Sequence, residues 1–245
     1  MPERTTATTM PEATDAAAAT AALELADWRR QVAELYGEVR RLASRDPRAA
    51  WERWRTARER LYREHPQSPV AAAERGGFRA RHFPYDPGLR FELPLLPADG
   101  RRPEDRADAG PDRRRSPVPG PGPLRLPTSA APVEPLAFDR VGWLAVPFPA
   151  GTRRLALFRL RDYAGGLFLP VGDATNGAAT YGAGRYVLDT AKGADLGGDA
   201  AAGTLVVDFN FAFQPSCAFD PRWACPLAPA ENRLDLPIEA GERLA

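Results

Sequence analysis

The chain has 245 residues, with 33 basic and 32 acidic side chains, and a formal net charge of +1. This balance argues against a strongly electrostatic partner such as duplex DNA. Hydrophobic residues make up 44% of the sequence, a share typical of globular domains with a sizeable core. No run approaches the ~20 apolar residues that span a bilayer, and the first residues lack the apolar centre of a secretory signal. We therefore expect a cytoplasmic protein without membrane association.

Two amphipathic helices are expected near the start of the chain. Apolar side chains from Trp28 to Leu42 recur at spacings of four, three, four and three, which places them on one stripe. Asp46 and Pro47 then supply an N-cap and a proline at the first position of a second helix, roughly 47–63. We interpret the pair as a hairpin that covers an apolar surface. The alternative, a basic surface for nucleic acid, is disfavoured because acidic residues are interleaved with the arginines.

Two segments have compositions typical of disorder. Residues 1–20 are small, polar and interrupted by prolines, and residues 99–135 hold nine prolines and seven arginines. Neither segment can bury enough apolar surface to offset its ordering entropy. We expect a disordered tail and a disordered insertion within one domain that spans 21–245. An alternative role for the insertion is a docking arm for acidic partners, in which Arg113, Arg114 and Arg115 form the clearest cluster.

The remaining pattern is that of β structure. Short apolar runs without intervening helices are expected to form strands over 89–95, 142–146, 155–160, 167–169, 180–188, 205–213 and 234–238. Such spacing favours an antiparallel sheet, a sandwich or a partly open barrel. Together with the helical hairpin packed on it, this arrangement predicts an α+β fold.

A series of motifs runs through the chain. They are Trp51 to Arg55, His65 to Pro69, Phe83 to Pro87, Asp173 to Thr175, Thr180 to Tyr186, Asp208 to Asn210, Pro215 to Phe219, Cys225 to Leu227 and Glu231 to Leu234. With these motifs the chain resembles the bacterial and archaeal family called domain of unknown function 1684, over about residues 25–95 and 136–242. The resemblance implies no reaction and no ligand. The chain departs from the family pattern at Gln214, where an asparagine is usual, and in the long segment 99–135.

The C-terminal half concentrates the residues from which a binding site is expected. Arg185 lies between aromatic residues and can bind a carboxylate or phosphate through a bidentate fork, although an internal ion pair with Asp208 or Glu231 is the alternative. Asp208 and Asn210 are two apart on an expected strand and therefore face the same side. We predict a pocket for a small anion, with its ligand-binding residues drawn from Tyr181, Arg185, Tyr186, Asp208, Asn210, Glu231 and Asn232.

Three functions are compatible with these features. The favoured one is a module that binds a small anionic ligand on a β scaffold, with no metal and no cofactor. A second is a hydrolase or isomerase in which Asp208 and Glu231 act as acid and base in one cleft. A third is a protein-interaction module that uses the helical pair and the insertion. The purely structural alternative is a buried polar network that pins the 214–232 loop to the sheet, formed by Asp208, Asn210, Glu231 and Asn232.

The two cysteines are not expected to bind zinc. Cys217 and Cys225 are eight residues apart, and structural zinc needs four ligands with short paired spacing. His65 and His82 are the only histidines, and neither has that spacing. We expect two reduced thiols that pack the loop, with a reversible disulfide as the alternative.

Overall fold

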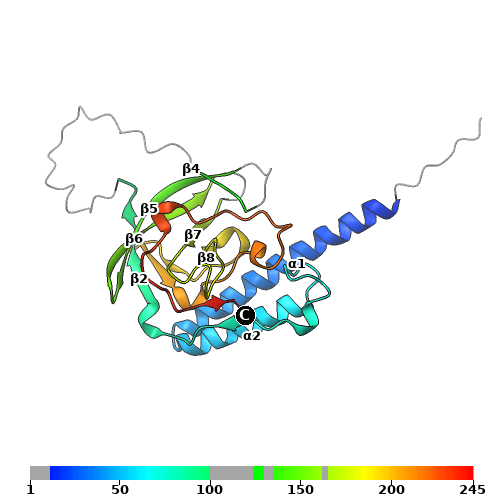
Figure 1. Cartoon of the computed structure of the whole chain (residues 1–245), viewed down its shortest axis with the longest axis horizontal. Coiled ribbons are helices and arrows are strands. Elements are labelled where there is room, and N and C mark those ends of the chain that lie inside the picture. The colour runs from blue at the N-terminus through cyan, green and yellow to red at the C-terminus, as the bar shows by residue number, and fades with distance from the viewer. Residues whose placement is uncertain (1–11, 100–123, 130–134, 162–164, 245) are drawn as a thin grey trace, which may run out of the picture.

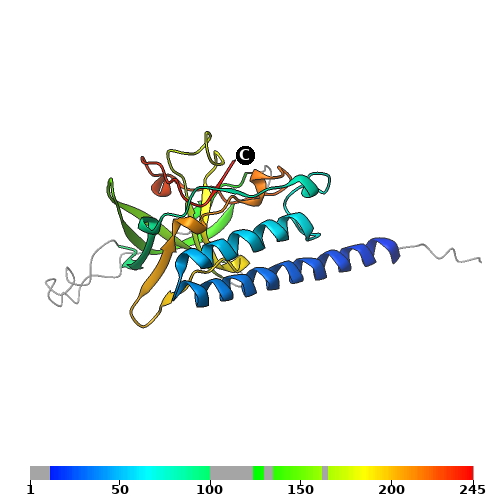
Figure 2. The same cartoon turned by 90° about the horizontal axis from the view of Figure 1, so that it is seen from below.

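A computed structural model describes residues 12–99, 124–129, 135–161 and 165–244. The fold belongs to the α+β class, as predicted: a helical hairpin packs against antiparallel sheets (Figure 1). Figure 2 shows the two helices side by side, with the N-terminal end of the first extending past the second. Within the described ranges the sheets do not close into a barrel. None of the helices in these ranges is both long and apolar enough to cross a bilayer.

The first helix is longer than the sequence pattern indicates. The expectation of a disordered tail over 1–20 is wrong for residues 12–20, which form the first turns of α1 (Glu12–Ala43). Residues 16–19 are all alanine, the residue with the highest helix propensity, and this outweighs the small polar neighbours. Residues 1–11 lie outside the described ranges.

The second helix, α2 (Pro47–Glu64), follows the prediction closely. The Asp46 side chain caps it by accepting a hydrogen bond from the Ala49 N–H at 2.9 Å. Two indole groups on its buried face connect it to the rest of the fold. Trp54 Nε1 donates to the Tyr36 hydroxyl of α1 at 3.1 Å, and Trp51 Nε1 donates to the Asn210 carbonyl at 2.9 Å. The full buried face consists of Ala50, Trp51, Trp54, Ala57, Leu61 and Tyr62.

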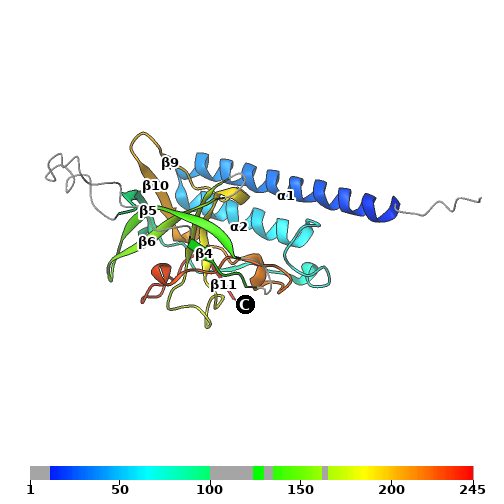
Figure 3. The same ribbon diagram turned by 90° about the horizontal axis from the view of Figure 1, so that it is seen from above.

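In the part of the chain that the structure describes, eleven strands form three antiparallel sheets. One sheet contains β3, β5, β6, β7 and β8 in that order, with β4 also paired to β5; a second has the order β2, β10, β9; and β1 pairs with β11. Figure 3 shows the long curved hairpin of β5 and β6. The bounds are β1 Arg81–His82, β2 Arg90–Pro94, β3 Leu96–Pro97, β4 Leu124–Leu126, β5 Leu136–Phe148, β6 Gly151–Leu160, β7 Leu167–Val171, β8 Arg185–Asp189, β9 Gly198–Asp199, β10 Thr204–Asp208 and β11 Glu242–Arg243.

The main core lies between the helices and the sheets. Residues Leu155 and Leu157 of β6 are almost fully enclosed together with Leu188 of β8 and Val207 of β10. The run from Leu155 to Phe158 is buried throughout, as expected for a central strand, and β6 is paired on both sides. A smaller cluster forms around Phe138 and Phe158 on the other side of this sheet.

Part of the expected insertion is ordered. Residues 124–126 form β4, which pairs with β5 so that Leu126 lies opposite Leu136, and Leu126 retains 1% exposure. The expectation of disorder over 99–135 is therefore wrong for 124–129, while residues 100–123 and 130–134 lie outside the described ranges. The prediction relied on the proline-rich composition of the whole segment. It therefore overlooked the short alternation of Leu124 and Leu126 around Arg125.

Two expected strands are shorter than the apolar pattern indicates. The strand expected over 180–188 begins only at Arg185, because the preceding residues form a turn in which the Gly184 N–H donates to the Tyr181 carbonyl at 3.0 Å. Gly184 adopts a φ of +100°, and a Cβ there would lie 2.6 Å from the Val171 carbonyl oxygen. The strand expected over 205–213 ends at Asp208, where the 3₁₀ turn Phe209–Phe211 begins.

The segment 234–238 alternates in burial but is not a strand. Leu234, Leu236 and Ile238 are buried as expected, and their neighbours along the chain are exposed. The segment forms no ladder with a named strand, because part of its backbone bonds elsewhere. Leu236 O accepts from the Ala174 N–H at 3.1 Å, and the carbonyl of Ile238 accepts a hydrogen bond from the Arg185 side chain.

The burial of Leu126 generates a stability prediction. Leu126→Ala should lower the free energy of unfolding by about 2–4 kcal/mol, because it leaves a cavity against the aromatic rings of the smaller cluster. Urea denaturation followed by tryptophan fluorescence measures this change. Leu136→Ala, at the exposed position directly opposite, is the matched control and should change stability by less than about 0.5 kcal/mol. Equal effects of the two substitutions would mean that β4 does not pack as described.

Candidate functional site

Arg185, the expected anion anchor, is enclosed in the interior. Its exposed fraction is 2%, and its Nη2 donates to Asp173 Oδ2 at 2.9 Å and to the Ile238 carbonyl at 2.8 Å. Its Nη1 donates to the carbonyls of Ala240 and Glu242. These contacts satisfy most of the guanidinium donors internally. The ion pair that the sequence leaves open as an alternative does form, but with Asp173 and not with Asp208 or Glu231.

The Arg185 contacts fix the C-terminal segment of the described chain. Three carbonyls between residues 238 and 242 converge on one guanidinium, which holds this segment against the N-terminal end of β8. Gly241 makes the approach possible, since its φ is +76° and a Cβ there would lie 2.4 Å from the Ala212 carbonyl oxygen. The Glu242 N–H then donates to the Ala212 carbonyl at 2.7 Å.

Asp208 and Asn210 form a second cluster. Asn210 is fully buried, and its Nδ2 donates to Asp208 Oδ1 and to the Asp86 carbonyl, both at 2.8 Å. The Asp86 N–H returns a hydrogen bond to Asn210 Oδ1 at 2.8 Å. Burial raises the pKa of Asp208 to about 6, and the hydrogen bonds from Asn210 oppose this shift. The cluster attaches the end of β10 to the segment before β2.

Glu231 and Asn232 lie in a third place. Arg140 of β5 holds Glu231 through a bidentate pair, with its Nη2 at 2.8 Å and 2.7 Å from the two carboxylate oxygens. Asn232 is fully buried and bridges two strands: its Nδ2 donates to the carbonyls of Ala156 at 2.9 Å and Pro170 at 2.8 Å. Asn232 therefore pins its loop to the sheet, as the network interpretation of the sequence anticipates.

The two tyrosines contact the loop between residues 214 and 232. The Tyr186 hydroxyl donates to the Pro226 carbonyl at 2.5 Å, and the ring lies edge-on to Phe168 and Phe213. Tyr181 neighbours Cys217, and its pKa is raised to about 12, first by burial and next by its hydrogen bond to that thiol.

The contacts therefore divide the expected site into separate structural clusters. Arg185 is held by Asp173, Asp208 by Asn210, and Glu231 by Arg140. The hypothesis of an acid–base pair made by Asp208 and Glu231 receives no support from these contacts, because the two carboxylates bond different neighbours. The anion-binding role of the seven residues stays a prediction, and the cavity described next is lined by other side chains.

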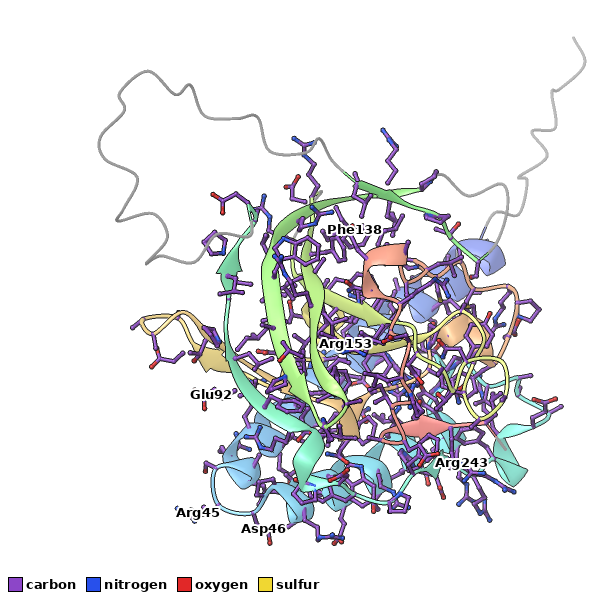
Figure 4. The ribbon with its side chains drawn as sticks, turned by 60° about the vertical axis from the view of Figure 1, so that its left-hand side comes forward. Arg45, Asp46, Glu92, Phe138, Arg153 and Arg243 are labelled. Atoms are coloured by element: carbon purple, nitrogen blue, oxygen red, sulfur yellow. The ribbon has the colours of Figure 1, made fainter. Side chains whose placement is uncertain are left out.

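That cavity, here called the arginine pocket, has a volume of about 490 Å³. It lies between the segment after α2, the β1–β11 pair and the loop after β10. Figure 4 shows one of its residues, Arg243, at the edge of the body beside β11. The charged, polar and aromatic side chains of its wall are Glu74, Phe78, Arg79, Arg81, Gln214, Phe219, Glu242 and Arg243.

The β1–β11 pair places two arginines directly opposite each other. In this two-residue ladder Arg81 faces Arg243 and His82 faces Glu242. Neighbouring residues of a strand point to opposite faces, so Glu242 is turned inward with 2% exposure and the two arginines lie on the exposed face. Like charges directly opposite in an antiparallel pair are destabilising. Among the residues that the structure describes, neither arginine forms an ion pair with a carboxylate.

The floor of the arginine pocket is a buried polar cluster. Glu242 accepts hydrogen bonds from Arg58, at 3.2 Å for Nη2 to Oε2, and from the Gln214 N–H at 2.8 Å. The Arg58 guanidinium also lies over the Tyr62 ring, 4.4 Å from its centroid. Burial lowers the pKa of His82 to about 4, against the opposing influence of Glu242, so the imidazole is neutral.

Gln214 carries the clearest unmet bonding capacity in the pocket. Its side chain is almost fully buried, its Nε2 donates to the Arg243 carbonyl at 3.3 Å, and its Oε1 accepts no hydrogen bond from any described residue. A buried acceptor without a partner loses its hydration without compensation.

Sequence reasoning missed Arg81 and Arg243 because strands of two residues carry no periodicity. The described ranges also hold no group of three or more histidine, cysteine, aspartate and glutamate side chains placed to bind a metal ion.

Comparison with known proteins agrees with this picture of fold and family. Residues 112–243 match the family described as Protein of unknown function (DUF1684), and because this is more than half of the chain, the chain belongs to that family. Among solved structures, an uncharacterized protein of Haloarcula marismortui, determined by solution NMR, is similar with a TM-score of 0.55 and 25% sequence identity. The similarity covers 82% of this chain and 96% of that one. No curated protein matches the chain.

The Arg185 contacts predict a large effect of a conservative substitution. Arg185→Lys should lower the free energy of unfolding by about 2–3 kcal/mol, because one ammonium group cannot replace a planar fork that bonds a carboxylate and three carbonyls. Arg153→Lys is the control: Arg153 is only partly buried and pairs with the exposed Asp235, and its replacement should change stability by less than about 0.5 kcal/mol. Urea titration measures both, and equal small effects would contradict the structural role of Arg185.

The pKa of Asp208 predicts a pH-dependent stability difference. Burial raises this pKa from 3.8 to about 6 in the folded state, so folding favours the protonated form and stability falls as pH rises through this window. Asp208→Asn removes the ionisation. Relative to the unmodified protein, this variant should therefore gain up to about 3 kcal/mol between roughly pH 4 and pH 7.5.

A second variant tests the sign of this effect. Asp235 is exposed, and its pKa is lowered by the hydrogen bond from Arg153, so Asp235→Asn should lose stability relative to the unmodified protein as pH rises. Thermal unfolding across the pH range measures both differences. A stability difference for Asp208→Asn that does not vary with pH would show that the Asp208 carboxyl is not desolvated.

Proposed function

We propose that the arginine pocket binds a small organic anion that carries an apolar or aromatic body and one hydrogen-bond donor. The protein would then act as a binding module for an anionic small molecule on an α+β scaffold. The volume of about 490 Å³ falls within the range of small-molecule sites. The following observations on charge, apolar surface and hydrogen bonding support the proposal.

The opposed pair of arginines is the observation that carries the proposal. Arg81 and Arg243 repel each other across the ladder, and the nearest ladder carboxylate, Glu242, is already bonded to Arg58 and Gln214. An anion seated between the two guanidinium groups would replace this repulsion by charge-assisted hydrogen bonds. Arg79 also lines the pocket and adds a third positive charge, against Glu74 as the one further acidic group of the wall.

The aromatic wall would hold the body of the ligand. Phe78 and Phe219 lie edge to face, with ring centroids 5.8 Å apart, and Tyr62 packs behind both rings. Val70 and Leu244 add aliphatic surface to the same wall. Aromatic and aliphatic surface next to cationic groups favours an organic anion over a free inorganic one, because burial of the apolar body contributes to affinity.

The Gln214 side chain specifies the third feature of the ligand. Its Oε1 can only accept and is closed to solvent in this structure, so a rotation of the side chain toward the pocket would bring it to a ligand hydroxyl or N–H group that satisfies it. A ligand without that donor would leave the oxygen unpaired and bind more weakly.

Three related probes separate these contributions. We expect para-hydroxybenzoate, which has a carboxylate, a ring and a hydroxyl donor, to bind more tightly than benzoate, and phenol not to bind measurably. Isothermal titration calorimetry gives the affinities, and the shift of the melting temperature checks them. Arg81→Gln and Arg243→Gln should each weaken binding of para-hydroxybenzoate by about tenfold, the loss of one charge-assisted hydrogen bond.

Arg45→Gln is the matched control for these variants. Arg45 is an exposed arginine at the turn between the helices, away from the β1–β11 pair (Figure 4), and its substitution should leave affinity unchanged. Equal affinity in the Arg81 and Arg243 variants would place any bound anion elsewhere. Equal losses in all three variants would indicate nonspecific attraction to surface charge.

A further inference from the structure

The two cysteines contact each other in the loop that follows β10. Cys217 lies in the 3₁₀ turn Ser216–Ala218, and its backbone N–H donates to the Sγ of Cys225 at 3.3 Å. Both are free thiols in this structure. Residues 219–224 between them are half-buried or exposed, so the loop that joins the two sulfurs lies near the surface.

Ser129 fixes the position of Cys225 from outside this loop. Its Oγ accepts from the Cys225 N–H at 3.0 Å and donates to the Trp223 carbonyl at 3.0 Å. Its own N–H donates to the Cys225 carbonyl at 3.0 Å. Cys225 is therefore held through both its backbone N–H and its carbonyl, and its Sγ lies against the backbone of Cys217.

The surroundings of the sulfurs are more polar than those of thiols that only fill a core. The neighbouring Cys225 thiol, and to a smaller extent the Tyr181 hydroxyl, lower the pKa of Cys217 against the opposing effect of burial. The hydrogen bond to Cys217 and burial raise the pKa of Cys225. The directions of the two shifts favour Cys217 over Cys225 as the thiolate of the pair.

We propose that Cys217 and Cys225 form an oxidisable dithiol, a modification site that exchanges with a low-molecular-weight disulfide to give a reversible intramolecular disulfide. This goes beyond the proposed ligand binding and does not depend on it. The Cys217 thiolate attacks one sulfur of the external disulfide, an S–S bond breaks, and one thiolate of the reagent leaves. Cys225 then attacks the Cys217 sulfur, transfers its proton to the second departing thiolate, and closes the internal bond.

The step balances without any other reactant. Two protein thiols are oxidised to one disulfide, and the external disulfide receives the two electrons and the two protons as two free thiols. Cys217 is assigned as the attacking residue because it is the more exposed of the two, at 8% against 3%, in addition to its thiolate character. Cys225 is the resolving residue.

The test uses the full chain incubated with oxidised glutathione under native conditions and analysed by intact-mass and peptide mass spectrometry. The expected product is a monomer that has lost two hydrogen atoms and yields a cross-linked peptide containing both cysteines; dithiothreitol should reverse it. Cys225→Ser should instead accumulate one glutathione on Cys217. Cys217→Ser should accumulate glutathione on Cys225 at least tenfold more slowly.

Three outcomes would overturn the proposal. One is a folded protein that keeps both thiols reduced while the urea-unfolded chain forms the internal disulfide in the same buffer. A second is a disulfide between two chains in place of the internal one. A third is faster glutathione addition to Cys225 in Cys217→Ser than to Cys217 in Cys225→Ser, which would reverse the two roles. Circular dichroism of each variant checks that loss of reactivity does not reflect unfolding.

Discussion

The ion pair between Arg185 and Asp173, with the carbonyls that surround it, is the constraint on which the C-terminal half of the fold depends. A buried guanidinium requires partners for nearly all of its donors. Here a carboxylate from the turn after β7 and three carbonyls of the segment 238–242 accept hydrogen bonds from the two Nη groups, while the buried Nε has no partner among the described residues. Residues that would otherwise have no strand partner are thereby ordered. Burying the Arg185 charge costs free energy unless its partners are in place. Arrangements of the C-terminal segment that leave the guanidinium without these partners are therefore disfavoured.

The order imposed by Arg185 reaches the arginine pocket through Glu242. The carbonyl of this residue bonds Arg185, and its side chain bonds Arg58 of α2. The helical hairpin, the strand β8 and the last described strand are thus connected through one residue. Because Glu242 faces inward, Arg243 must face outward beside Arg81. The positive charge of the pocket is a geometric consequence of the buried network beneath it.

Local signals in the sequence were sufficient for the helices, for most strands and for the α+β class. The Asp46 cap, the stripe of α2 and the apolar run at Leu155 act over short distances, so one sequence records them. The site could not be located in this way. Arg185 was recognised as a residue that must find partners, yet Asp173 and the carbonyls after residue 237 are distant in sequence. Because Arg185 is buried among internal partners, its guanidinium is not available to a ligand. Arg81 and Arg243 lie in strands of two residues, which are too short to show an alternating sequence pattern.

The connection between α2 and β11 also bears on how the chain reaches its native state. Arg58 and Glu242 are 184 residues apart in sequence, so their contact closes almost the whole described chain into one loop. Long loops close at an entropic cost that earlier contacts must already have offset, and topologies rich in such contacts fold slowly. The hairpin and the central sheet are therefore expected to form first. The pocket is then expected to assemble last, so that the ligand binding proposed for it would distinguish fully folded molecules from compact intermediates.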